Sequence, residues 1–458
     1  MTLSHDVQIW KLATRKRNRG HGVRWRVEKN EFSKWFATYA LADSYRSRLL
    51  RCTRKGEGFD TDSGMPESIL REQRAVTWFE LACRYVDLKW PRAAAKTRTS
   101  TADALATVTP VLVTSTRHMP EPEVLREVLY GWAFHKTRRD QGEPEGDVAE
   151  ALTWIRESSL KVTALDEKDR RSELIRGALN ALALRMDGKP AAATTVARKR
   201  AVFHGVLTYA VELDILPANP IDKVSWKAPK VAEEVDRRAV ASPRQIQALL
   251  AAVKAERPEL AAFFGCLYYA FMRPGEAVSL RLENCISLPE AGWGRLVLTD
   301  NSPRVGAQWT DTGKSHDERH LKHRAEKTKR EVPIPPVLVR LLRDHLKRSD
   351  VETEDELLFR GARGGPLSES VYGPIWQRAR KAALSPAQVR SPLAARPYDL
   401  RHGGVTLALN AGVPAPEVAR RAGHSVEVLL RVYAGCIDGH DRIWNTRIDE
   451  ILKGDGED

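Results

Sequence analysis

The sequence predicts a mainly α-helical protein with small β elements, divided into three domains. Helical periodicity runs through most of residues 69–228 and returns after residue 240, whereas strand patterns are confined to the first 60 residues and two short apolar runs. At about 150 residues per domain, a chain of 458 residues also suggests about three domains. We expect a β-sheet plus helix at residues 1–60, a helical domain at 69–228 and a mixed α/β domain at 240–450.

The composition narrows the class of partner. Lys and Arg number 74 against 60 Asp and Glu, a formal net charge of +14, and 42% apolar residues are enough for hydrophobic cores. A fully disordered chain is therefore excluded. A basic chain favours a polyanionic partner, either nucleic acid or an anionic membrane. The most apolar stretch, residues 261–272, is too short for a membrane span, which needs about 20 residues.

The termini and the cysteines indicate the compartment. The N-terminal segment has no apolar region of the kind that a secretory signal contains. The five cysteines are far apart, odd in number and without a CxxC pair, which argues against a disulfide framework and a zinc ribbon. We therefore expect a cytoplasmic protein, with DNA or RNA as its polyanion and no membrane partner.

The first 60 residues hold 14 Lys or Arg against 6 Asp or Glu, more than half of the excess charge. Apolar residues alternate with arginines in a predicted strand, aromatic residues follow in a second strand, and residues 40–52 read as a helix. The apolar positions are Val23, Trp25 and Val27, then Phe32, Trp35 and Phe36. Such a module either contacts DNA or simply carries a solvated basic surface.

The second domain reads as helices alone. The pattern predicts helices over residues 74–90, 121–137, 147–158, 169–186 and 194–213. Linkers are predicted at residues 55–68 and 225–241. After the second linker, Ser242, Pro243 and Gln245 form the signature of a capping box with proline at the first helical position. A new domain therefore starts there, with strands predicted at residues 294–298 and 331–335.

Three clusters of the third domain carry chemistry. Arg273 follows an apolar helix and lies at the start of the next one, where free N–H groups and a guanidinium would together seat a phosphate. Arg401 stands in the segment Tyr-Asp-Leu-Arg-His, and His424 precedes Tyr433 by nine residues. Each cluster has a plainer explanation: a helix start, a capping histidine or a core tyrosine. The order of all three along the chain favours the functional explanation.

This order resembles the tyrosine recombinase, or phage integrase, family. The matching text is MRPGEAVSLRLENC, LKHRAEKTKREVPIPP, YDLRHGGVTLALNAGVPAPEVARRAGHS and LLRVYAGC, within roughly residues 243–445. The resemblance implies a mixed α/β tyrosine-recombinase catalytic domain. It also implies a helical, SAM-like core-binding domain before it and, more loosely, an AP2-like arm-binding domain at the N-terminus.

The resemblance assigns roles that the residue types support. Arg273 and Arg401 would bind the oxygens of a phosphodiester, because guanidiniums stay charged and can donate two bonds at once. Tyr433 would attack the phosphorus and form a phosphotyrosyl bond. His424 would hydrogen-bond the phosphate, and a hairpin lysine would protonate the leaving oxygen. Lys322 matches that lysine best and Lys327 is its rival.

One position departs from the family pattern. The family segment usually begins with histidine, where this chain has Tyr398, which cannot become a cation near neutral pH. We expect activity to survive. His402, directly after Arg401, either contacts the reacting groups or packs the site. Glu276 is expected to be a buried partner that orients Arg273 or a backbone group, rather than a catalytic base.

The resemblance implies a site-specific recombinase of a phage or other mobile element, working as a homotetramer on double-stranded DNA attachment sites. An accessory directionality factor would set the outcome. Because the phosphotyrosine bond keeps the energy, no cofactor and no metal are needed. Two alternatives stay open: a type IB topoisomerase-like enzyme that nicks and reseals one duplex, and a non-catalytic DNA-binding protein with the same fold.

Overall fold

The computed structural model describes residues 2–14, 20–74, 76–142, 144–231, 234–301, 304–315, 317, 319–320, 329–349, 351, 353, 355–436, 445–446, 448–450 and 452. The chain divides into two compact units. The N-terminal unit comprises residues 1–92 and 100–229, and the C-terminal unit residues 93–99 and 230–458. The further division of the N-terminal unit into two domains stays a prediction. Within the described residues, no helix combines the length and apolarity needed to cross a membrane.

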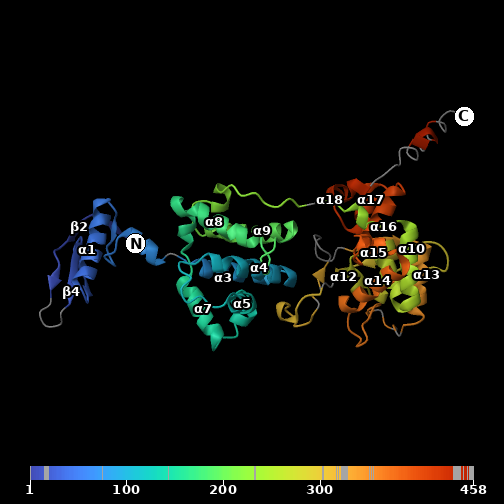
Figure 1. The fold of residues 1–458 in the computed structure, drawn as a ribbon, viewed down its shortest axis with the longest axis horizontal. Coiled ribbons are helices and arrows are strands. Elements are labelled where there is room, and N and C mark those ends of the chain that lie inside the picture. Colours follow the sequence, from blue (N-terminus) through green and yellow to red (C-terminus); the bar gives the residue numbers. More distant parts are fainter. Residues whose placement is uncertain are drawn as a thin grey trace. The chain divides into compact units, whose positions relative to one another are not determined.

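The first sheet of the N-terminal unit is built around strand β4 (His21–Val27), drawn in blue in Figure 1. β4 pairs antiparallel with β5 (Asn30–Phe36), β2 (Val7–Ile9) and β3 (Ala13–Thr14). Val23, Trp25 and Val27 of this strand share one buried cluster with Leu49 of helix α1 (Tyr39–Arg54). A short pair, β1 (Leu3–Ser4) with β6 (Phe59–Asp60), completes the module. The predicted sheet plus helix is confirmed.

The rest of the N-terminal unit is helical, and four of the predicted helices are present as α3, α7, α8 and α9. The predicted helix over residues 121–137 is instead interrupted by a π-helical turn, η3. A helix that was not predicted, α4, has Ser or Thr at five of its fourteen positions, which weakens its helical signature. The elements are α2 (Glu67–Arg74), α3 (Trp78–Lys89), η1 (Trp90–Arg92), α4 (Ala95–Val108), η2 (Thr109–Val111), α5 (Pro122–Val128), η3 (Leu129–Ala133), α6 (Lys136–Arg139), α7 (Asp147–Ser158), η4 (Val162–Asp166), α8 (Lys168–Leu182), α9 (Ala193–Glu212) and η5 (Pro220–Lys223).

The C-terminal unit is helical around two short strand pairs (Figure 1). The predicted capping box is present, with the Ser242 side chain accepting from the main chain of Gln245. The elements are η6 (Arg237–Ala239), α10 (Pro243–Glu256), η7 (Pro258–Leu260), α11 (Ala261–Tyr269), α12 (Pro274–Val278), η8 (Leu282–Asn284), β7 (Gly294–Leu298), β8 (Asp300–Asn301), η9 (Ala307–Trp309), β9 (Arg319–His320), β10 (Arg330–Ile334), α13 (Pro336–Leu346), α14 (Glu369–Ala383), α15 (Pro386–Arg390), α16 (Asp399–Asn410), α17 (Ala415–Ala422), α18 (Val426–Tyr433) and η10 (Ala434–Cys436).

Helix α11 lies at the centre of the C-terminal unit. Eight of its nine residues are buried, and it packs against α10, α13 and α16. A helix that is apolar on every side is stable only in such a core. Helix α16 approaches it closely at Gly404, where a Cβ atom would lie 2.0 Å from the carbonyl oxygen of Tyr268. This close approach brings Arg401, one turn earlier on α16, to the end of α11.

A strand pair and a second hydrophobic cluster lie near Arg401. Strands β7 and β10, both predicted from the sequence, pair antiparallel, with Leu296 opposite Val332. Helices α16, α17 and α18 enclose a second, smaller hydrophobic cluster that includes Val405, Val418, Leu429 and Tyr433. The start of β10, the start of α12 and the ends of α17 and α18 thereby converge on one region.

Candidate active site

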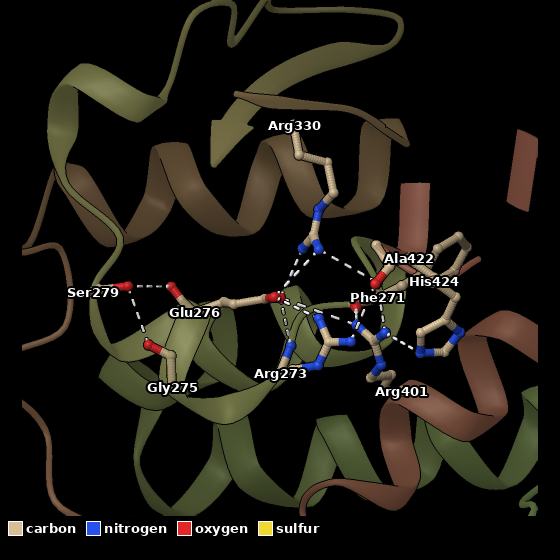
Figure 2. Close-up of polar contacts among 10 residues, drawn as sticks. Phe271, Arg273, Gly275, Glu276, Ser279, Arg330, Arg401, Ala422 and His424 are labelled. Carbon is tan, nitrogen blue, oxygen red and sulfur yellow. Dashed lines mark hydrogen bonds and ion pairs between the residues drawn. The ribbon is translucent and has the colours of Figure 1, made fainter. Parts of the chain in front are cut away.

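The carboxylate of Glu276 organises the region. It lies on α12, is 2% exposed, and its Oε1 accepts from Nη1 of Arg273 at 2.8 Å. Its Oε2 accepts from the main-chain nitrogen of Arg273 at 2.9 Å, so the residue that caps the helix is held at both ends. Nη2 of Arg273 also donates to the carbonyl of Gly423 at 3.2 Å. Glu276 is thus the buried partner of Arg273 that the sequence predicts (Figure 2).

A second arginine binds the same carboxylate. Arg330 is the first residue of β10 and is 2% exposed. Its Nη2 donates to Glu276 Oε2 at 2.7 Å and its Nη1 to Oε1 at 3.2 Å, which makes a bidentate pair; Figure 2 draws Arg330 above the carboxylate. Nη1 also donates to the carbonyl of Ala422 at 3.3 Å. Sequence reasoning did not single out Arg330 for this role.

Arg401 is fully buried against backbone carbonyls. Its Nη1 donates to the carbonyl of Phe271, and its Nη2 donates to that of Ala422 at 2.5 Å. Phe271 adopts a positive φ of 53°, a conformation that side chains other than glycine rarely take. The turn between α11 and α12 holds this conformation, which places the Phe271 carbonyl against the Arg401 guanidinium. The Arg401 Nη1 lies 4.0 Å from Glu276 Oε2, too far for a hydrogen bond.

The cluster of three arginines and one glutamate carries a surplus of two positive charges. Burial by itself would raise the pKa of Glu276, but the three guanidiniums lower it to about 2, so it is ionised. Burial lowers the pKa of Arg401, and the charge of Arg273 lowers it further. Buried charge is costly unless it is paired. The surplus therefore favours an anion next to Arg273 and Arg401.

His424 completes the cluster at the end of α17. Helix α17 ends with Gly423 at φ 67°, and the chain reverses so that His424 Nε2 lies 2.8 Å from Nη2 of Arg401. Because the guanidinium can only donate, Nε2 accepts and the ring proton sits on Nδ1. Burial, reinforced by Arg401 and Arg273, lowers the pKa of His424 to about 3, so the ring is neutral. Its Nδ1 is buried without a hydrogen-bond partner among the described residues.

Tyr433, the last residue of α18, is 1% exposed, and its hydroxyl lies 2.9 Å from Nδ1 of His402. Burial raises the pKa of Tyr433, while the Arg401 guanidinium lowers it in part. Burial lowers the pKa of His402 to about 4. A neutral imidazole beside a protonated phenol is arranged to accept the phenolic proton. Tyr398 contacts the same imidazole, with ring centroids 5.0 Å apart in an edge-on arrangement.

The structure brings six of the predicted site residues together: Arg273, Tyr398, Arg401, His402, His424 and Tyr433. The candidate general acids, Lys322 and Lys327, lie outside the described residues. The residues that sequence reasoning missed are Arg330 and the two residues whose carbonyls accept from the arginines, Phe271 and Ala422. The one signal in the sequence is that Arg330 directly precedes the predicted strand at residues 331–335.

Comparison with known proteins gives the family. A family model described as the phage integrase family matches residues 240–436. The integrase of Mycobacterium phage L5 is 26% identical over 254 residues, 55% of this chain and 62% of that protein. The tyrosine recombinase XerC of Mesorhizobium japonicum is 30% identical over 105 residues, 23% of this chain and 32% of that protein. The chain thus spans less than two thirds of the length of these curated relatives.

Among solved structures, a lambda integrase dimer bound to a COC′ core site matches with a TM-score of 0.47 at 14% identity, covering 94% of this chain and 95% of that chain. The family match covers every described residue of the arginine, histidine and tyrosine cluster. Residues 240–436 of this chain thus match the phage integrase family, and they contain the whole described site.

Proposed function

We propose that the chain is a site-specific DNA recombinase, an integrase of a phage or other mobile element, which cuts and rejoins DNA through a 3′-phosphotyrosyl intermediate. The observation that carries this proposal is the Tyr433 hydroxyl, bonded to a neutral imidazole beside a buried cluster of guanidiniums. A structural tyrosine in a core needs neither a base nor a neighbouring cationic surplus.

The substrate phosphate would bind at Arg273 and Arg401. A phosphodiester carries one negative charge, and attack at phosphorus builds a second in the transition state. The surplus of two positive charges in the cluster matches that final charge, and donors fixed in advance stabilise the transition state more than the ground state. The Nδ1–H of His424, which has no partner among the residues that the structure describes, would donate to a phosphate oxygen.

The first chemical step would proceed from Tyr433. Its hydroxyl proton passes to Nδ1 of His402 while its oxygen attacks the phosphorus. The bond between Tyr433 and phosphorus forms as the bond from phosphorus to the 5′ oxygen breaks. That oxygen takes a proton from a hairpin lysine, Lys322 or its rival Lys327, and leaves as a free 5′-hydroxyl. Attack by a 5′-hydroxyl of the partner duplex reverses these transfers and releases the tyrosine.

His402 in this scheme does the work that the family histidine would do at position 398. Tyr398 cannot accept a proton from Tyr433, because a phenol is not a base near neutral pH. It does contact the His402 ring and limits the rotation of that ring. The departure from the family pattern at Tyr398 is thereby compensated one helical turn further along α16.

The remaining parts of the chain would hold the DNA. The N-terminal module is proposed as the arm-binding domain, because residues 1–60 carry a net charge of +8. On this module the guanidinium of Arg24 lies over the ring of Trp10, 5.3 Å from the ring centroid. Residues 69–228 would form the core-binding domain. Exchange between two duplexes needs four active sites, so we propose a homotetramer on double-stranded DNA in the cytoplasm, with an accessory factor setting direction. No cofactor or metal is needed for transesterification.

A nicked suicide substrate that carries the attachment site tests the proposal. The protein should form an adduct with DNA that resists SDS, and Tyr433→Phe should form none. Absence of an adduct from the unaltered chain would favour a non-catalytic DNA-binding protein. Adduct formation without strand transfer between two duplexes would instead favour the topoisomerase-like alternative, which the basic N-terminal module argues against.

A further inference from the structure

We propose that Arg330 is a positioning residue that holds both phosphate-binding arginines, Arg273 and Arg401, in the geometry needed for cleavage. This inference rests on the proposed function. Arg330 does not itself reach the substrate: its guanidinium is buried, and both of its Nη atoms are engaged by Glu276 and Ala422. It would act through those two neighbours.

The first connection runs through Glu276. Each carboxylate oxygen takes one bond from Arg330 and one from Arg273, whose guanidinium donates to Oε1 and whose main-chain nitrogen donates to Oε2, so the two arginines share the acceptor. Loss of Arg330 would leave one lone pair of each oxygen unsatisfied in a buried site. Arg401 is a third cation beside this carboxylate, and its Nη1 lies 4.0 Å from Oε2. It would be drawn toward Glu276 and away from the phosphate.

The second connection runs through the end of α17. The carbonyl of Ala422 accepts from both Arg330 and Arg401, and the carbonyl of Gly423 accepts from Arg273. These carbonyls form the negative end of the helix dipole, which favours nearby guanidiniums. Arg330 also fills the space beside Gly423, where a Cβ atom would lie 2.0 Å from its Nη1. The same guanidinium therefore sets the position of the segment that carries His424.

Position in the chain adds a third reason. Arg330 opens β10 opposite Leu298 of β7, directly after the segment that contains Lys322 and Lys327. An arginine anchored beside Glu276 fixes the point at which β10 begins. Its loss would disturb the arginines first and the returning strand second.

The test compares Arg330→Met and Arg330→Lys with the full unaltered chain on two nicked substrates, one with a normal scissile phosphate and one with a neutral methylphosphonate. On the phosphate, we expect Arg330→Met to lower the single-turnover cleavage rate about 100-fold, as loss of one oriented donor does. The methylphosphonate has no anionic oxygen for the arginines to bind. On that substrate Arg330→Met should therefore lower the cleavage rate by less than about fivefold. Arg330→Lys keeps the charge without the bidentate geometry and should behave like Arg330→Met.

Glu331→Gln is the matched control, because this neighbouring side chain is exposed and makes only a loose pair with Arg295 at 3.7 Å. It should cleave both substrates normally. Equal deficits of Arg330→Met on both substrates, or an unchanged rate, would overturn the inference. If Arg330→Met fails to fold, Arg330→Lys and Gly423→Ala, which presses on the same guanidinium from the other side, must show the same substrate dependence. An unaltered chain that forms no adduct on either substrate would instead overturn the proposed function.

Discussion

Replacement of His402 by glutamine removes the proposed base while keeping a hydrogen-bond acceptor near the Tyr433 hydroxyl. General base catalysis contributes about 10²- to 10⁴-fold to a rate, which corresponds to about 3–5 kcal/mol in the barrier. We expect the upper part of that range. Tyr433 is only 1% exposed, so water has little access to replace the base, and burial raises the pKa of the phenol that must lose its proton.

The assay is single-turnover formation of the covalent adduct on a nicked substrate between pH 5.5 and 8. The pKa of His402 is lowered to about 4, below the ordinary value of 6.5, so protonation inactivates the base only near pH 4. At pH 5.5 only about 3% of the base would be protonated, and the rate should change less than twofold over the range. A histidine with an ordinary pKa would be about 90% protonated at pH 5.5, and the rate would fall roughly tenfold.

Two results would refute this reasoning. One is a His402→Gln enzyme that cleaves within threefold of the unaltered chain while remaining folded. The other is a rate that falls with a midpoint near pH 6.5. Tyr398→Phe is the matched control, because it keeps the ring contact with His402 and should leave both the rate and the flat profile unchanged.

Three further outcomes follow from the same geometry. Glu276→Gln leaves three guanidiniums, two of them buried, without their counter-charge and should destabilise the C-terminal unit by about 3–5 kcal/mol, seen in urea unfolding. Because burial lowers the pKa of His402 and His424 in the folded state, the unfolded chain binds more protons in mild acid. The free energy of unfolding should therefore fall by about 2 kcal/mol from pH 7.5 to 5.5, less in a variant with glutamine at both positions. Gly404→Ala would press a methyl group onto the Tyr268 carbonyl and should lower the melting temperature by more than about 5 °C.

Local patterns predicted much of this fold because local physics decides it. The alternation of Val23, Trp25 and Val27 indicates one buried strand face, and the capping box at Ser242 marks a helix start wherever the chain lies. The position of Arg273 at a helix N-terminus could be predicted for the same reason. The π-helical interruption after α5 was not, because a helical repeat of apolar residues looks the same with one extra residue in a turn.

The site was only partly predictable for a different reason. Arg330 and Glu276 are 54 positions apart, and no periodicity links a strand start to a short helix. The carbonyl of Phe271 reaches Arg401 only because that residue adopts a positive φ, a conformation decided by the tertiary packing around the turn. The resemblance to a family identified which residues act. Only the three-dimensional contacts indicate which of them hold the others in place.

The central claim, that the Tyr433 oxygen forms the covalent bond with DNA, has one direct measurement. The SDS-resistant adduct can be trapped on a nicked substrate, digested with trypsin and nuclease, and the modified peptide sequenced by mass spectrometry. The account predicts a nucleotide phosphate on Tyr433 and on none of the other nine tyrosines of the chain. A phosphate on another residue, or an adduct that persists in Tyr433→Phe, would contradict it.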